Sequence, residues 1–434
     1  MSDRPSLVSN PAILSTPPAP AGVRSAYLHI PFCRRRCFYC DFPVAVIGDR
    51  PMPGTIEGMD RYVTALIREL TITAELTSKT GSPPLETVFF GGGTPSLLPV
   101  EQLERILAAL DLAFGFATNV EIAIEMDPGT FDFDRVTAYR SLGINRVSLG
   151  VQAFQDELLA LCGRSHRTAD TLEAVALLRR AGVGNLSLDL MSGLPHQSLQ
   201  QWQESLEQAI ALEPEHLSCY DLIVEAGTPF NKQYEPGERP LPTDEDAAAM
   251  YRLARECLGA AGFEHYEISN YARPGHQCRH NRTYWELQPF YGFGMGAASF
   301  WNRRRLTRPR TRQSYYDWVA TWERSPAVLL QAAEIQSALD CLLEGLMLGL
   351  RLAEGVDLAV LGERYSEAVL PALTQAVYPY RECGWVEAVA PDGTCLAAAV
   401  PLSAARRLRL SDPEGMLFSN TVLAAAFAAF ECAE

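Results

Sequence analysis

Residues 25–42 read SAYLHIPFCRRRCFYCDF, so a short β-type run leads directly into three cysteines. This run, at 26–30, is the first of six that share a pattern of apolar and β-branched residues followed by residues with helical spacing. The other five lie at 87–90, 121–126, 146–152, 185–191 and 216–223. Strands and helices in alternation predict a parallel sheet covered by helices, and therefore an α/β fold. The periodicity alone is compatible with an open doubly wound sheet or with a barrel.

Polar side chains and glycines recur where these predicted strands end. Glu125 and Asp127 close the third strand, Gln152 closes the fourth, Asp189 lies in the fifth, and a glycine triplet at 91–93 follows the second. In βα folds the carboxyl ends of the strands form the ligand-binding face, so we expect these groups to converge over the cysteine loop. The glycines would let backbone N–H groups approach a ligand, or would simply form a tight turn. Glu125 could likewise form a salt bridge inside the fold instead of binding a ligand.

Cys33, Cys37 and Cys40 have a spacing that suits an iron–sulfur cluster. Three thiolates in a tight loop can hold three irons of a cubane and leave the fourth iron open to a substrate or cofactor. The chain has 11 cysteines, an odd number spread along its length, which does not indicate a disulfide framework. A zinc site would need a fourth ligand and is usually built from paired Cys-x2-Cys knuckles. Buried free cysteines are the remaining alternative.

The sequence predicts three parts along the chain. Residues 1–23 carry five prolines and no regular period, which predicts a disordered Pro-rich tail. The alternation of strands and helices continues from residue 24 and stops near residue 326, so residues 24–326 form the first folded domain. A helix with a leucine stripe is expected from about Ala332, a hairpin near 391–393, and a last helix capped by Ser419 or Asn420. Residues 327–434 are therefore expected to form a small α+β domain resembling a winged helix.

The composition is that of a globular protein. The chain has 434 residues, of which 47% are hydrophobic and 21% are charged, which excludes a disordered or fibrous protein. Its 37 Lys and Arg against 52 Asp and Glu give a net charge of −15, which disfavours nucleic acid as a partner. The longest apolar run, 422–430, is far too short to span a bilayer, and no secretory leader is apparent. We expect a cytoplasmic protein without a transmembrane segment, for which peripheral membrane contact stays open.

The cysteine segment at 27–42 resembles the signature of the radical S-adenosylmethionine (SAM) superfamily, and in particular its oxygen-independent coproporphyrinogen III oxidase-like family. The resemblance covers about residues 25–420 and continues through the segments 91–98, 125–130, 143–166 and 189–195. It implies a partial (βα)6 TIM-like barrel as the radical SAM core. It also implies a [4Fe-4S] cluster held by Cys33, Cys37 and Cys40, with SAM bound to the open iron.

The same resemblance implies which residues line the SAM site. They are Tyr27, Tyr39, Gly92, Gly93, Thr94, Glu125, Gln152, Arg164 and Asp189, with Ile223 as a weaker candidate. A reduced cluster could pass one electron to SAM and release a 5′-deoxyadenosyl radical, so that the cofactor carries the chemistry. A flavodoxin or a ferredoxin would then be the electron donor.

Two features point to the heme chaperone branch of this family, the HemW-like proteins. The oxidases carry a further cysteine two residues after the third ligand, where this chain has Phe42. Residues 266–275 and the hexapeptide His280-Asn281-Arg282-Thr283-Tyr284-Trp285 resemble the chaperone branch, whose proposed heme-binding motif is this hexapeptide. We therefore expect His280, Asn281, Tyr284 and Trp285 to contact heme, because imidazole can ligate iron and aromatic rings offer a flat apolar surface.

Several residues keep a second interpretation. His280 could be a structural histidine that forms hydrogen bonds inside a loop. Cys278 could be a second soft ligand, but a single cysteine more often has no ligand role. The six arginines within 303–312 could be a solvated loop, or could contact propionates or an acidic partner. Asp127 and Ala298 stand where relatives usually carry Asn and His.

These observations predict a heme chaperone of the radical SAM family. It would bind one [4Fe-4S] cluster, SAM and heme, and would transfer heme to respiratory heme proteins. The alternative is an enzyme of porphyrin biosynthesis, an oxygen-independent coproporphyrinogen III oxidase that makes protoporphyrinogen IX by oxidative decarboxylation. Phe42 disfavours this alternative, and residues 280–285 favour the chaperone.

Overall fold

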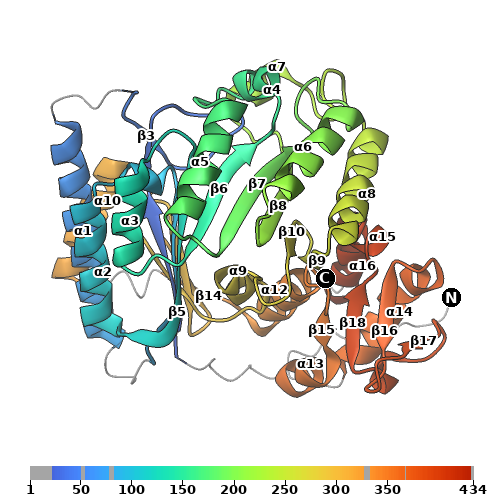
Figure 1. Cartoon of the computed structure of the whole chain (residues 1–434). Coiled ribbons are helices and arrows are strands. Elements are labelled where there is room, and N and C mark those ends of the chain that lie inside the picture. Colours follow the sequence, from blue (N-terminus) through green and yellow to red (C-terminus); the bar gives the residue numbers. More distant parts are fainter. Residues whose placement is uncertain (1–21, 50–53, 78–82, 327–332, 367, 432–434) are drawn as a thin grey trace.

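The computed structural model describes residues 22–49, 54–77, 83–326, 333–366 and 368–431. Nearly all of the predicted Pro-rich tail, residues 1–21, lies outside the described residues. Within the described part, a sheet of nine strands forms the centre of the molecule, and a smaller α+β module follows it (Figure 1).

Six parallel strands lie side by side in the main sheet in the same order as in the chain. All six were predicted from the sequence. They are β1 (Ser25–Ile30), β4 (Leu85–Gly92), β5 (Phe116–Met126), β6 (Arg146–Gln152), β7 (Leu186–Ser192) and β8 (His216–Asp221). A doubly wound sheet reverses its strand order at a switch point, and these six strands do not. The α/β fold is therefore confirmed, and the strand order is the one that a (βα) barrel uses.

Amphipathic helices between the strands flank the sheet (Figure 1). Leu103, Ile106, Leu107 and Leu110 on α2 are all buried, as their spacing predicts, so this face of the helix is removed from water by the sheet and its neighbours. The helices of this part are α1 (Thr55–Thr77), α2 (Val100–Phe114), α3 (Phe133–Ser141), α4 (Asp156–Leu161), α5 (Thr168–Arg180), α6 (Leu199–Ala211), α7 (Pro229–Gln233) and α8 (Asp244–Ala260).

The segment after α8 adds strands to both edges of the sheet. β10 (Asn270–Ala272) pairs antiparallel with β8, and β9 (Glu264–Glu267) pairs with β10. β11 (Tyr291–Phe293) pairs parallel with β1 at the opposite edge. Between β10 and β11 lies the short helix α9 (Arg279–Trp285), which contains the predicted heme motif. Figure 1 shows α9 beneath the amino ends of the central strands, away from the cysteine loop.

A small three-stranded sheet and one helix connect this part to the rest of the chain. β12 (Ala298–Trp301), β13 (Arg304–Thr307) and β14 (Glu334–Ile335) pair in that order, and α10 (Arg312–Arg324) follows β13. The ion pair between Glu69 of α1 and Arg308 holds this region against α1, and both side chains are buried.

The C-terminal module has a core of its own. One cluster of buried apolar residues ends at Ala333 and the other begins at Cys341, while residues 327–332, where the domain boundary is predicted, lie outside the described part. The predicted hairpin is present, because β16 and β17 pair on either side of 391–393. The elements are α12 (Ala338–Gly349), β15 (Val356–Asp357), α13 (Leu358–Tyr365), α14 (Val369–Glu382), β16 (Val386–Val389), β17 (Cys395–Leu396), β18 (Arg407–Leu410), α15 (Glu414–Leu417) and α16 (Ser419–Glu431).

One predicted element boundary was wrong. The helix expected from about Ala332 begins at Ala338, because the Ser337 side chain accepts a hydrogen bond from the Asp340 N–H and the Asp340 carboxylate accepts one from the Ser337 N–H. This reciprocal cap ends the preceding extended segment, β14. None of the helices in the described residues is long and apolar enough to cross a membrane.

Candidate functional site

A cavity of about 560 Å³ opens at the carboxyl ends of the central strands and reaches into the interior of the sheet. All three cysteines of the loop line it, as does every residue assigned to the SAM site by resemblance. Ile223 lies at its rim and is 68% exposed. The predicted residues that line the cavity are Tyr27, Cys33, Cys37, Tyr39, Cys40, Gly92, Gly93, Thr94, Glu125, Gln152, Arg164, Asp189, Ile223, His280, Asn281 and Tyr284.

The cysteine loop begins at the end of β1. β2 (Phe32–Cys33) pairs with β3 (Ala45–Val46), and this pairing closes the loop at its base. The Cys40 N–H donates to the Cys37 carbonyl at 3.2 Å, which forms a turn between these two cysteines. Cys33, Cys37 and Cys40 are each partly exposed toward the cavity, so their sulfur atoms are available to a common ligand.

The glycine triplet follows β4 directly and lies against this loop. A Cβ atom on Gly93 would come within 2.8 Å of the Phe32 carbonyl oxygen and 2.9 Å of the Cys33 sulfur. A Cβ on Gly92 would lie 2.5 Å from the His29 ring, and its φ of 112° also favours glycine. Both glycines are therefore needed for the close approach of two backbone segments, and Gly92 also donates its N–H to Glu125 at 3.0 Å.

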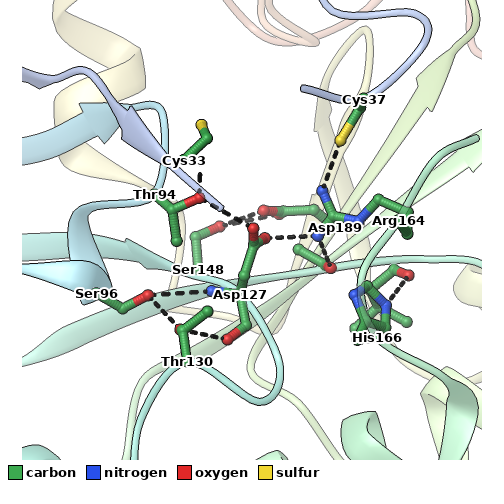
Figure 2. Close-up of polar contacts among 12 residues, drawn as sticks. Cys33, Cys37, Thr94, Ser96, Asp127, Thr130, Ser148, Arg164, His166 and Asp189 are labelled. Carbon is green, nitrogen blue, oxygen red and sulfur yellow. Dashed lines mark hydrogen bonds and ion pairs between the residues drawn. The ribbon is translucent and has the colours of Figure 1, made fainter. Parts of the chain in front are cut away.

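Asp127 connects the cysteine loop to Arg164 (Figure 2). Its Oδ1 accepts a hydrogen bond from Arg164 Nη2 at 2.5 Å, and its Oδ2 accepts one from the Thr94 hydroxyl at 3.1 Å. Arg164 Nη1 lies 3.5 Å from the Cys37 sulfur, and the Thr94 hydroxyl lies 3.7 Å from the Cys33 sulfur. Two hydrogen-bond donors, both held by one carboxylate, thus face the sulfur atoms of two of the cysteines.

Two carboxyl groups are buried deeper in the same cavity. Burial and the neighbouring Asp189 carboxylate raise the pKa of Glu125 to about 8, so this group is largely neutral at neutral pH. Burial also raises the pKa of Asp189, although hydroxyl groups of the inward-facing Ser148 and Ser187 bond to it and favour its charged form. The pair can accept and donate hydrogen bonds to ligand hydroxyl groups inside the cavity.

The residues present fit a cluster and SAM. The three thiols supply the soft ligands of an iron–sulfur cluster, and within the described residues no three metal-binding side chains converge closely enough to hold a single ion. Arg164 lines the cavity. Its Nε atom is buried and has no hydrogen-bond partner among the described residues. An anionic ligand group such as a carboxylate would satisfy this donor.

The predicted heme motif divides between two places. His280 is 1% exposed and bonds through both ring nitrogens, Nδ1 to the Thr87 hydroxyl at 2.8 Å and Nε2 to the Tyr284 hydroxyl at 2.8 Å. Its ring also stacks on Phe89, with centroids 5.2 Å apart. Together with Asn281 and Tyr284 it forms the floor of the large cavity, whereas Trp285 lines a second cavity elsewhere. A bond from His280 Nε2 to iron would require the Tyr284 hydroxyl to move away.

Other residues singled out in the sequence have intramolecular partners. In the basic run, Arg308 pairs with Glu69, Arg305 with Glu344 and Arg310 with Asp41. The run is therefore mainly a set of internal contacts and not a solvated loop. Ala298 lies in β12 opposite Thr307 and does not line the large cavity.

The cavity also contains polar residues that sequence reasoning missed. They sit on the inner face of the strands, where an alternating pattern would otherwise place apolar side chains, and this polar interruption of the strands is the signal that could have revealed them. They include Arg146, Ser148, Ser187, His216 and Ser218.

Comparisons with known proteins agree with this geometry. Residues 27–209 match the radical SAM superfamily model, and residues 336–389 match the HemN C-terminal domain model. The heme chaperone HemW of Synechocystis is 48% identical over 94% of this chain and 97% of that protein. The heme chaperone HemW of Bacillus subtilis is 35% identical over 80% of this chain and 88% of that protein.

Among solved structures, the fold is similar to that of coproporphyrinogen III oxidase (HemN) from Escherichia coli. The TM-score is 0.75, and the match covers 95% of this chain and 91% of that one. The sequence identity is 20%, so this likeness concerns the fold alone.

Proposed function

This chain belongs to the HemW family of heme chaperones within the radical SAM superfamily, and we propose that it binds a [4Fe-4S] cluster, SAM and heme and transfers heme to respiratory heme proteins. The proposed binding of the cluster and SAM is supported by one observation: a single cavity combines three thiols, a glycine-rich turn and two buried carboxyl groups. The heme part is supported by the name that the relatives share. We also propose that the first domain ends at residue 326.

Cys33, Cys37 and Cys40 are the proposed cluster ligands, and the bound cluster would supply one electron at a time. Arg164 and Thr94 are placed to donate hydrogen bonds toward the sulfur atoms of Cys37 and Cys33. Such bonds orient metal ligands and tune their electronic properties. A flavodoxin or a ferredoxin is the proposed class of electron donor.

SAM is proposed to occupy the part of the cavity between the cysteine loop and the two carboxyl groups. The unpartnered Arg164 Nε donor suits its carboxylate, and Glu125 and Asp189 suit its ribose hydroxyls. The ring of Tyr39 and the side chain of Gln152 form part of the cavity wall. Tyr27, Gly92, Gly93 and Thr94 complete the proposed contacts.

Heme is proposed to contact the motif at 280–285. Burial lowers the pKa of His280 to about 3, so its imidazole is neutral and chemically able to bind iron. Its two hydrogen bonds compete with that role in the present arrangement.

The decisive experiment compares heme binding with porphyrin turnover. Anaerobically reconstituted protein is incubated with reductant, SAM and coproporphyrinogen III, and the porphyrins are separated by chromatography while heme binding is titrated by absorbance. We expect stoichiometric heme binding without conversion of coproporphyrinogen III. Phe42 is 54% exposed at the cavity and offers a ring where the oxidases have a thiol. Sustained formation of protoporphyrinogen IX would replace the chaperone proposal with the oxidase.

A further inference from the structure

A groove of about 370 Å³ lies beside the last part of the cysteine loop, and we call it the loop groove. Its walls are the segment 41–45, which directly follows Cys40, and the residues around the start of α10. Arg36, Asp41 and Phe42 line both the loop groove and the large cavity. The two hollows therefore open next to each other, on the face of the molecule that carries the cysteines.

The loop groove is positively charged although the chain is acidic. Three arginines and one aspartate line it, in a chain whose net charge is −15. Arg310 pairs with Asp41, whereas Arg36 and Arg312 form no ion pair within the described residues. The amino end of α10, at Thr311 and Arg312, also lines the groove, and the amino end of a helix favours negative charge nearby. The groove therefore attracts anionic groups.

Two of these arginines are attached to the backbone that follows the third cysteine. Arg36 donates to the Cys40 carbonyl at 3.0 Å and to the Phe42 carbonyl at 3.2 Å. Arg310 donates to the Asp41 carbonyl between them. Three consecutive carbonyl groups thus position two guanidinium groups without neutralising their positive charge. The basic surface therefore begins at one of the proposed cluster ligands.

Phe42 gives the loop groove an exposed aromatic ring beside its cations. Aromatic residues and Arg are the residue types that are enriched at protein interfaces, and Phe42 is 54% exposed. Electron-transfer partners form small interfaces, of less than about 1,200 Å², which suits one ring and a few arginines. The heme motif lies on α9, at the amino ends of the strands and away from this face (Figure 1). A protein docked at the groove would thus lie close to the proposed cluster ligands and not to the heme motif.

We propose that the loop groove is the docking surface for the electron donor, a small acidic electron-transfer protein whose carboxylates face Arg36, Arg310 and Arg312 and which covers Phe42. The proposal rests on the function proposed above, in which Cys40 is a cluster ligand. In the transfer step the donor loses one electron and the oxidised cluster gains it, and no bond forms or breaks. Complementary charges speed up the encounter of two such proteins, and salt screens them.

Stopped-flow reduction of the cluster-loaded, full-length protein tests the proposal, with a fully reduced flavodoxin of net negative charge as the donor. At an ionic strength of about 20 mM, Arg312→Glu and Phe42→Ala should each lower the second-order rate constant by at least about fivefold. The effect of Arg312→Glu should shrink at about 0.5 M, where the Debye length is about 4 Å. Titration calorimetry with the oxidised flavodoxin should show a matching loss of affinity, which is a readout that needs no electron transfer.

Two controls separate docking from other effects. Arg324→Glu makes the same change of charge at the opposite end of α10, about 18 Å away along the helix, and should behave like the wild type. Dithionite is a small reductant that needs no docking surface. It should reduce the cluster of every variant to the same extent as in the wild type, which shows that the cysteine loop is intact.

The outcomes separate the docking surface from the function. Wild-type rates in both Arg312→Glu and Phe42→Ala would overturn the docking surface and leave the proposed function intact. Equal slowing by Arg324→Glu would show that only the overall charge matters, and would overturn the surface as well. Impaired heme transfer in these variants, with unchanged cluster reduction, would assign the groove to a heme-recipient protein instead. A wild-type chain that holds no cluster would overturn the proposed function itself.

Discussion

Glu125 and Asp189 are buried in one cavity but have different hydrogen-bond partners. Hydroxyl groups of Ser148 and Ser187 bond to the Asp189 carboxylate, whereas Glu125 accepts one backbone N–H, from Gly92. Hydrogen bonds from hydroxyl groups favour the charged form of a carboxylate, so they favour it more for Asp189 than for Glu125. The two carboxyl groups therefore differ in how strongly the protein favours their charged forms.

The raised pKa of Glu125 predicts a pH-dependent stability difference. A carboxyl group whose pKa rises from 4.5 to about 8 on folding stabilises the fold fully below about pH 4.5, and this contribution is lost as the pH rises through 8. Glu125→Gln, which cannot ionise, should therefore gain stability relative to the wild type between pH 5 and pH 9, by at most about 5 kcal/mol.

Denaturant unfolding of the cluster-free protein at pH 5, 7 and 9 measures this difference. The exposed Glu207→Gln on α6 is the control and should show no such trend. A free-energy difference between Glu125→Gln and the wild type that is the same at all three pH values would contradict the assignment of a raised pKa.

At the scale of elements, a buried ion pair attaches the region of β12, β13 and α10 to helix α1. Glu69 of α1 accepts from Arg308 at 2.7 Å, from the Tyr315 hydroxyl of α10 at 2.7 Å, and from the Gly294 N–H at 2.9 Å. Arg308 donates as well to Ser299 of β12. Charges are buried at a net cost unless they are paired, so this network keeps its elements in one arrangement.

Removing one partner of this network should be strongly destabilising. Arg308→Met leaves the Glu69 charge buried without its cation, and we expect a loss of about 3–5 kcal/mol in the free energy of unfolding. In a double-mutant cycle, Glu69→Gln combined with Arg308→Met should cost clearly less than the sum of the single variants. Additive effects in chemical denaturation would show that the two side chains do not interact as described.

At the scale of the whole molecule, polar contacts from α8 and β9 hold the C-terminal module. Asp412 accepts from Arg255 at 2.7 Å and pairs with His265 at 2.8 Å. Arg252 and Glu414 form a second pair nearby, which is more exposed and contributes little. On the other side, Arg282 of α9 pairs with Glu354. The module is thus tied to the rest of the chain at two places.

Asp412→Asn should loosen this attachment in a pH-dependent way. Burial alone would raise the pKa of Asp412, but the contacts with His265 and Arg255 hold it below its usual value. Its contribution is therefore present above about pH 4 and is lost as the pH falls further. We expect Asp412→Asn to lose about 1–3 kcal/mol at pH 7.

Denaturant unfolding at pH 7 and pH 3.5 measures this effect, with the exposed Asp111→Asn on α2 as the control. The difference between Asp412→Asn and the wild type should shrink at the lower pH. An equal difference at both values would mean that the charge of Asp412 does not contribute to the docking of the module.

Local sequence patterns were sufficient to predict the features that depend on residues close together in the chain. The six strands, the helix faces and the cysteine loop follow from spacing, because burial and ligand geometry act over a few residues. The convergence of Glu125, Gln152 and Asp189 also followed, since parallel strands bring their carboxyl ends to the same side. The sequence by itself therefore determined the α/β fold and placed Cys33, Glu125 and Asp189 at one end of the sheet.

Tertiary structure decided what depends on partners far away in the chain. The bonds of His280 to Thr87, the burial of Arg308 against Glu69, and the separate cavity of Trp285 all involve contacts with distant segments. No local pattern specifies them, because a side chain's hydrogen bonds and burial depend on which elements pack around it. For the same reason the order of the strands, which separates a barrel from a doubly wound sheet, became visible only in the folded chain.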